Sequence, residues 1–120
     1  MKTLLVVDDD ESIRALLDDM LSPTYRVLLA ADAQQALDLF SREQPDLVVL
    51  DIRMPGIDGL TLLNRLRETA RDLPIIIFSA FEEYRQDIKT WASDAYVVKS
   101  PDVDKLQTAI EKLLGEARSS

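Results

Sequence analysis

The stretch Leu47-Val48-Val49-Leu50, followed at once by Asp51, decides the fold of this chain. Four apolar residues in succession are typical of a strand that is covered on both faces, as in a parallel sheet. Two more runs have the same character, Leu4-Leu5-Val6-Val7 and Ile75-Ile76-Ile77-Phe78. We therefore expect a parallel sheet with helices packed on both of its faces.

Strands and helices are expected to alternate along the chain. The strands are predicted over Thr3–Val7, Tyr25–Ala30, Asp46–Leu50, Leu73–Phe78 and Ala95–Val98. The second of these contains Arg26 and suits a sheet edge. Apolar residues at helical spacing follow each strand. They are Ile13, Leu16, Leu17, Met20 and Leu21; Ala33, Ala36, Leu37 and Phe40; Leu60, Leu63 and Leu66; Tyr84, Ile88 and Trp91; and Val103, Leu106, Ile110, Leu113 and Leu114.

Several helix starts carry capping patterns. Asp32 and Gln35 have the spacing of a capping box. Ser100-Pro101 predicts a cap residue followed by proline at the first position of the last helix. Asp10, ahead of the first helix, suits an N-cap.

Five strand–helix units in 120 residues are too few for an eight-stranded barrel. They favour an α/β fold with an open, doubly wound five-stranded parallel sheet of flavodoxin-like strand order 2-1-3-4-5. In such a sheet, ligands bind at the carboxyl ends of the strands beside strand 1. We expect one domain over residues 1–120, with 115–120 as a frayed tail.

Composition narrows the function. The net charge of −8 disfavours direct binding to nucleic acid or to an anionic membrane. The chain has no histidine, so it has no imidazole base, and any phosphohistidine must belong to a partner. It has no cysteine, which excludes disulfides and thiolate metal sites. No apolar run approaches the roughly 20 residues of a membrane span, and Met1–Val7 is too short for a secretory signal, so we expect a cytoplasmic location.

Polar residues mark the carboxyl ends of four predicted strands. Asp8 and Asp9 follow the first strand, Asp51 the third, Ser79 the fourth and Lys99 the fifth. These four strands are neighbours in the expected order. Their end residues should therefore converge on one pocket.

Such a pocket can carry phosphoryl chemistry. Three carboxylates repel one another, and a divalent cation together with the Lys99 ammonium would balance them. Mg²⁺, or Mn²⁺, suits an all-oxygen site. A carboxylate can attack phosphorus to give an aspartyl phosphate, and the transfer needs little beyond alignment and charge neutralisation. The Ser79 hydroxyl could donate to a phosphoryl oxygen.

Each of these residues also has an ordinary structural explanation. The acids after the first strand could serve the dipole of the following helix. Asp51 could belong to a turn, Ser79 could cap a helix, and Lys99 could be a solvated charge. All four explanations would have to hold at once, at four adjacent strand ends. A common site accounts for them together.

Four ordered motifs carry a resemblance to a known family. They are Leu4-Leu5-Val6-Val7-Asp8-Asp9-Asp10, Asp46-Leu47-Val48-Val49-Leu50-Asp51-Ile52-Arg53-Met54-Pro55-Gly56-Ile57-Asp58-Gly59, Ile76-Ile77-Phe78-Ser79-Ala80 and Asp94-Ala95-Tyr96-Val97-Val98-Lys99. From about Lys2 to Leu114 the chain resembles the response-regulator receiver domain, the phosphoacceptor module of two-component signalling. The resemblance implies a phosphorylation-activated switch rather than an enzyme.

The resemblance also implies roles for single residues. Asp51 would be the phosphoacceptor. Asp8 and Asp9 would hold the metal with Asp51 and the main-chain carbonyl of Arg53. Lys99 would contact the phosphoryl oxygens.

Two further residues would transmit the signal by the same resemblance. Ser79 would move toward the phosphoryl group, and Tyr96 would swing inward with it, although simple packing of a strand tyrosine is an equal alternative. The output surface would be the fourth helix, fifth strand and fifth helix. The donor would be a sensor histidine kinase or a histidine phosphotransfer protein, the target a downstream effector, and phosphorylation-dependent homodimerisation is left open.

One position departs from the family pattern. The family usually has proline directly after the lysine, joined by a cis bond, whereas Ser100 intervenes here and Pro101 follows. We expect either a trans Lys99–Ser100 bond with a shifted loop or a cis bond that costs about 2.5–4 kcal/mol. Either outcome would affect the reach of Lys99.

Three other functions compete. A haloacid-dehalogenase-type phosphatase would use Asp8 as nucleophile in an Asp8-x-Asp10 motif, but would leave Asp51 without a role. A flavin-binding electron carrier would need an uncharged phosphate loop where the acids stand. A receiver that binds partners without being phosphorylated would not need the intact acid set, but the departure at Ser100 leaves this alternative open.

Overall fold

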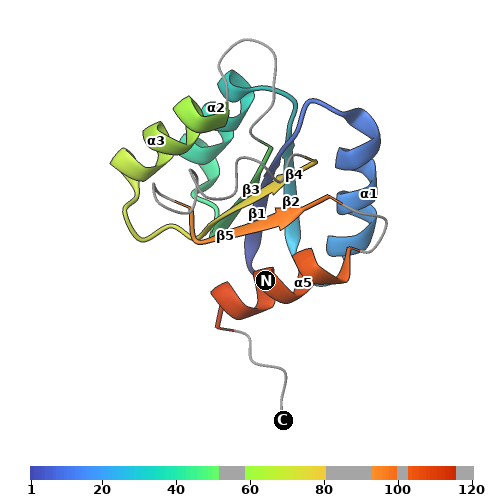
Figure 1. The fold of residues 1–120 in the computed structure, drawn as a ribbon. Coiled ribbons are helices and arrows are strands. Elements are labelled where there is room, and N and C mark those ends of the chain that lie inside the picture. Colours follow the sequence, from blue (N-terminus) through green and yellow to red (C-terminus); the bar gives the residue numbers. More distant parts are fainter. Residues whose placement is uncertain (52–58, 81–92, 100–102, 116–120) are drawn as a thin grey trace.

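The computed structural model describes residues 1–51, 59–80, 93–99 and 103–115. Within these ranges the strands form one sheet, and the helices pack around it (Figure 1). The strands are β1 (Thr3–Val7), β2 (Arg26–Ala30), β3 (Leu47–Leu50), β4 (Ile75–Ser79) and β5 (Ala95–Val98). The helices are α1 (Glu11–Leu21), α2 (Ala33–Glu43), α3 (Gly59–Thr69) and α5 (Asp104–Leu113).

The sheet is parallel throughout, and its strand order is β2-β1-β3-β4-β5, as predicted. β2 lies at an edge, which agrees with its mixed composition. In the register, Val7 lies opposite Leu50, Leu50 opposite Ile77, and Ser79 opposite Val98. The carboxyl ends of four adjacent strands therefore lie along the same edge of the sheet.

Among the described residues, two helices pack on each face of the sheet. Figure 1 shows α2 and α3 on one side of the sheet and α1 and α5 on the other. Because side chains alternate along a strand, each face buries its own set of strand residues. Under α2 and α3 lie Leu5, Val7, Val48, Leu50, Ile75 and Ile77, packed with Ala33, Ala36, Leu62, Leu63 and Leu66. Under α1 and α5 lie Leu4, Val6, Leu47, Val49, Ile76, Phe78 and Val97, packed with Leu17, Leu21, Leu106 and Ile110.

The predicted N-caps are confirmed for α1 and α2. The carboxylate of Asp10 accepts the main-chain N–H of Ser12 at 2.8 Å. The carboxylate of Asp32 accepts the N–H of Gln35 at 2.8 Å, and the Gln35 side chain accepts the N–H of Ala31. In a capping box the Gln35 side chain would accept the N–H of the cap residue Asp32, whereas here it accepts the N–H of the preceding residue, Ala31.

Two helix predictions are wrong. Leu16, which the spacing predicts in the apolar stripe of α1, is 46% exposed, because at about 100° per residue it lies about 140° around the helix from buried Leu21. The last helix does not begin at Ser100-Pro101. It begins at Asp104 after Val103, whose side chain makes no capping bond.

An arginine on α3 joins this helix to the starts of β4 and β5. The Arg67 guanidinium donates to the carbonyl of Leu73 at 2.6 Å and to Asp94 Oδ2 at 2.9 Å. Asp94 Oδ2 also accepts the N–H of Ile75 at 2.8 Å. These contacts fix where β5 begins and thereby support the strand that leads to Lys99.

Some predictions fall outside the described residues. They concern the fourth helix with Tyr84, Ile88 and Trp91, the Lys99–Ser100 bond, and residues 116–120 of the predicted tail. No helix among the described residues is both long and apolar enough to cross a bilayer.

Candidate phosphoacceptor site

Main-chain hydrogen bonds continue past the strand ends and fix the residues that follow them. The N–H of Asp8 donates to the carbonyl of Ala30, and the N–H of Asp51 donates to that of Val7. The N–H of Lys99 donates to the carbonyl of Ser79 at 2.8 Å. Since each bond ties a residue to the neighbouring strand, the sheet itself determines where these side chains begin.

Three carboxylates meet at this edge of the sheet. One oxygen from each of Asp8, Asp9 and Asp51 lies within 4.8 Å of the others. Asp8 and Asp51 are buried, with 2% and 7% of their surface exposed, and Asp9 is exposed. The structure therefore brings together all three predicted acids, although Asp51 lies more than 40 positions from Asp8 and Asp9 in the sequence.

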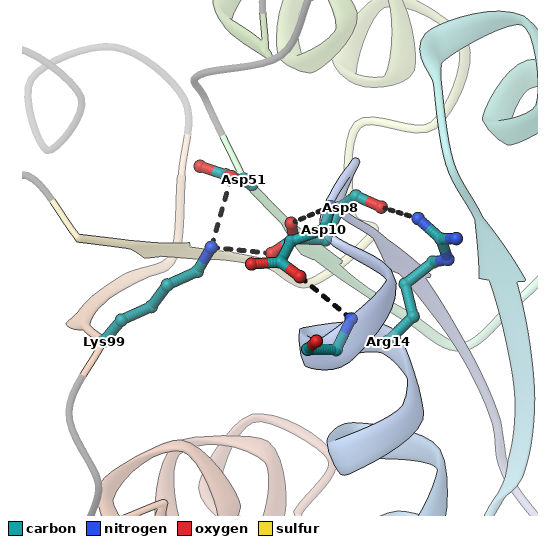
Figure 2. A network of polar contacts seen from close by, with 6 residues as sticks. Asp8, Asp10, Arg14, Asp51 and Lys99 are labelled. Atoms are coloured by element: carbon teal, nitrogen blue, oxygen red, sulfur yellow. Dashed lines mark hydrogen bonds and ion pairs between the residues drawn. The ribbon is translucent and has the colours of Figure 1, made fainter.

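The Lys99 ammonium lies between two of these acids (Figure 2). Its Nζ is 2.7 Å from Asp8 Oδ2 and 3.2 Å from Asp51 Oδ2. The ammonium also lies 5.8 Å from the centre of the Phe78 ring, close enough for a cation–π interaction. The departure at Ser100 therefore does not displace Lys99, and the alternative that this lysine is a solvated charge is wrong.

Asp8 is held by contacts to both its side chain and its main chain. Its Oδ1 accepts the N–H of Asp10 at 2.9 Å, while its main-chain oxygen accepts Nη1 of Arg14 at 2.8 Å (Figure 2). Its remaining carboxylate oxygen faces Lys99. This carboxylate is consequently fixed in one orientation before any ligand arrives.

Burial and charge act on the titration of the site. Burial raises the pKa of Asp8 above its ordinary value, and the repulsion of Asp51 adds to this, while Lys99 and the Asp10 N–H oppose it. Burial by itself lowers the pKa of Lys99, but the hydrogen bond and charges of the two acids outweigh it and the pKa is raised. Lys99 therefore stays protonated throughout the physiological range.

Ser79 and Tyr96 lie on the same face of the sheet. Ser79 is fully buried at the end of β4. Tyr96 lies opposite Ile77 in the register, packs against the core under α2 and α3, and Ile77 precedes Ser79 by two residues. Because residues two apart in a strand share a face, the tyrosine and the hydroxyl are diagonal neighbours.

One predicted site residue cannot be placed. The main-chain carbonyl of Arg53, expected as a metal ligand, lies outside the described residues. Two contacts at the site were missed by the sequence analysis, the Arg14 bond to Asp8 and the Phe78 ring near Lys99. A signal for the first was present, because a cation early in a helix is unfavourable to the helix dipole.

The three carboxylates of Asp8, Asp9 and Asp51, here called the acid cluster, suit Mg²⁺. Carboxylate oxygens are the ligands that this ion prefers, and two oxygens on one Mg²⁺ lie at most about 4.2 Å apart. The observed separations within 4.8 Å are close to that limit. Three carboxylates and one ammonium leave two negative charges, which a divalent cation balances.

A carboxylate cluster that could hold a divalent cation, with a lysine beside it at the carboxyl edge of a doubly wound sheet, is typical of phosphoacceptor proteins. Residues 4–111 match the family described as the response regulator receiver domain. The chain therefore belongs to the response-regulator receiver family, whose members are phosphoacceptors rather than conventional enzymes. This finding decides against the phosphatase and the flavin-binding carrier.

Individual relatives support the same assignment. The chain is 35% identical over 114 residues to sporulation initiation phosphotransferase F of Bacillus subtilis, covering 92% of each chain. Other curated relatives, 39–41% identical and named as regulators, are longer, and this chain spans only 44–50% of their length.

Solved structures agree in fold. The response regulator TrrA of Thermotoga maritima, in complex with Mg²⁺–BeF, superposes with a TM-score of 0.89 at 43% identity, over 94% of this chain and 99% of that one. In a second structure TrrA is bound to the histidine kinase ThkA, and the TM-score is 0.87 over 95% and 99% of the two chains.

Proposed function

We propose that the chain is a signalling switch whose Asp51 accepts a phosphoryl group from a phosphohistidine donor. The observation that carries the proposal is the position of the Lys99 ammonium, 3.2 Å from Asp51 and 2.7 Å from Asp8 within the acid cluster. A cation at this point can neutralise charge on a phosphoryl group that arrives at Asp51.

The reaction is a single displacement. An oxygen of the Asp51 carboxylate attacks phosphorus and forms an O–P bond as the P–N bond of the donor breaks. The electron pair of that bond leaves with the donor imidazole, which takes up a proton from solvent. The chain itself supplies the nucleophile, the Lys99 charge and the Ser79 hydroxyl as a donor to a phosphoryl oxygen.

The same proposal includes a magnesium ion. Asp8, Asp9 and Asp51 would hold it, with the main-chain carbonyl of Arg53 as a further ligand, and Mn²⁺ could take its place. When bound, the ion supplies positive charge to the phosphoryl oxygens. The TrrA complex with Mg²⁺–BeF supports this part of the proposal by analogy.

The signal would pass through Ser79 and Tyr96. Movement of the Ser79 hydroxyl toward the phosphoryl group would vacate space that its diagonal neighbour Tyr96 can enter. Tyr96 lies on β5, so its movement would alter the surface formed by the fourth helix, β5 and α5. A downstream effector, or a second phosphorylated copy, would bind there.

The donor would be a sensor histidine kinase or a histidine phosphotransfer protein. The chain has no histidine of its own, so the phosphohistidine must come from a partner. The complex of TrrA with ThkA and the relative named as a phosphotransferase support both kinds of partner. We place this exchange in the cytoplasm.

The test is labelling by acetyl phosphate with and without Mg²⁺. The wild-type chain should take up phosphate only with Mg²⁺, and Asp51→Asn should not be labelled. The matched control is Asp32→Asn, at the same edge of the sheet, because asparagine caps a helix as well as aspartate does. Undiminished labelling of Asp51→Asn would refute the proposal, and an unlabelled wild-type chain would favour a receiver that binds partners without being phosphorylated.

A further inference from the structure

Among the described residues, two basic side chains form a hydrogen bond or ion pair with Asp8, Asp9 or Asp51, and they are Lys99 and Arg14. Arg14 is the fourth residue of α1, and its side chain is partly buried. Its Nη1 donates to the main-chain oxygen of Asp8 at 2.8 Å, not to a carboxylate (Figure 2). Arginine makes its stronger hydrogen bonds to carboxylates, so this contact with a main-chain oxygen beside a carboxylate cluster needs a physical reason.

The position is electrostatically unfavourable for the helix. A cation in the first turns opposes the dipole, which favours anions there. The contact completes a set of four that fixes Asp8: its N–H bonds to Ala30, its two carboxylate oxygens to Asp10 and Lys99, and its carbonyl to Arg14. The Arg14 contact is the only one of the four that fixes the orientation of the carbonyl.

The carbonyl of Asp8 shares a rigid peptide plane with the N–H of Asp9. Whatever orients that carbonyl therefore also orients the backbone from which the Asp9 side chain departs. Asp9 is the exposed member of the acid cluster, so its carboxylate is not confined by packing as those of Asp8 and Asp51 are. The direction of the peptide plane must then decide much of its position.

We propose that Arg14 is a positioning residue for the metal site, because its bond to the Asp8 carbonyl aims the Asp9 carboxylate at the cation position between Asp8 and Asp51. The inference rests on the proposed function only in taking this cluster as a Mg²⁺ site. Arg14 touches neither the metal nor the phosphoryl group in this role. It acts through the backbone of the loop between β1 and α1.

Charge and positioning predict opposite effects when Arg14 is replaced. Removing a positive charge near three carboxylates should by itself tighten the binding of a cation. Removing the hydrogen bond should loosen the loop and weaken the binding of the cation. Loss of such supporting contacts typically weakens metal binding by about tenfold to a hundredfold. The sign of the change in Mg²⁺ affinity therefore shows whether the charge of Arg14 or its hydrogen bond has the larger effect.

The experiment measures Mg²⁺ affinity of the full chain by calorimetric titration, without any phosphodonor. Arg14→Met, which keeps much of the aliphatic part of the side chain but has no donor, should bind Mg²⁺ about tenfold more weakly than wild type. The matched control is Arg42→Met on α2. Arg42 also donates to a main-chain carbonyl, that of Asp38, but far from the cluster, so this variant loses the same charge and should keep its Mg²⁺ affinity.

Unchanged or tighter Mg²⁺ binding by Arg14→Met would overturn the inference, and so would a lower melting temperature of the metal-free variant without any change in affinity. If Arg14→Met does not fold, Arg14→Gln, whose side chain is too short to reach, serves with the same expected weakening and the same contrary result. If wild type binds Mg²⁺ and the variants bind it equally well, only the role of Arg14 fails. If wild type binds no Mg²⁺, the proposed function fails as well.

Discussion

Replacing Lys99 by methionine tests how the buried charges of the site are balanced. The ammonium is the cation between Asp8 and Asp51, whose side chains are only 3% and 8% exposed. Methionine keeps much of the aliphatic packing but leaves both carboxylates without this partner. The metal-free protein should lose stability, and Mg²⁺ should restore much of it.

The expected size follows from the distances. At 2.7 Å and 3.2 Å, with an effective dielectric constant of about 20, the two attractions amount to about 6 and 5 kcal/mol. Desolvation of the ammonium offsets a large part, and breaking a buried ion pair typically costs about 3–5 kcal/mol. Since Lys99 is 18% exposed, we expect the lower end, a loss of about 3 kcal/mol.

The assay is urea unfolding with a chelator and again with saturating Mg²⁺. At a hundred times its dissociation constant a ligand stabilises the folded state by about 2.7 kcal/mol. Mg²⁺ should stabilise Lys99→Met more than wild type, because the metal no longer competes with the ammonium for the carboxylates. Lys105→Met, an exposed lysine of α5, is the matched control and should change stability little with or without Mg²⁺.

Two results would refute this reasoning. One is a metal-free Lys99→Met variant as stable as wild type, which would mean that the ammonium does not balance the buried acids. The other is an equal loss of stability with and without Mg²⁺, which would mean that the metal does not share the carboxylates that Lys99 contacts.

Three further predictions concern the site and its support. Because burial raises the folded-state pKa of Asp8 above 3.8, the stability that its protonated form contributes is present below pH 3.8 and lost as the pH rises through the folded-state pKa. Relative to wild type, metal-free Asp8→Asn should therefore become more stable as the pH rises from 3.8 to neutral, and each kcal/mol should raise its melting temperature by about 4 °C. The melting temperature of this variant should no longer respond to Mg²⁺. Parallel pH profiles of the two proteins would contradict this. Arg67→Met should lower the free energy of unfolding by about 2 kcal/mol in urea, and no loss would show that its bonds to the starts of β4 and β5 are dispensable. Leu17→Ala should cost about 3 kcal/mol but exposed Leu16→Ala less than about 0.5 kcal/mol, and equal costs would place both residues in the core.

The sheet and the meeting of the acids were predictable from the sequence. Continuous apolar runs such as Leu47–Leu50 require cover on both faces, and five alternating units leave few topologies. Once the strand order is fixed, Asp8 and Asp51 must lie at neighbouring strand ends. Local patterns thus predict a contact between residues far apart in the sequence, because the strand order and register of the parallel sheet place the ends of neighbouring strands side by side.

The details that failed depend on geometry that a linear pattern does not contain. Leu16 precedes buried Leu17 and so resembles a member of the apolar stripe, but it lies at the edge of that stripe, about 140° around the helix from buried Leu21, and is exposed. Ser100-Pro101 has the composition of a helix start, yet α5 begins three residues after Pro101, at Asp104. Phe78 acts on the site through a single contact that has no sequence signature of its own, and the only sequence signal for the Arg14 contact is a cation at an unfavourable position early in a helix.

The central claim, that Asp51 is the residue that carries the phosphoryl group, can be tested by locating the modification. The chain is phosphorylated with acetyl phosphate and Mg²⁺, the acyl phosphate is reduced with borohydride to homoserine, and the peptides are sequenced by mass spectrometry. We predict homoserine at position 51 and at no other acidic position. Homoserine at position 8, or none at all in a chain that binds Mg²⁺, would contradict the account.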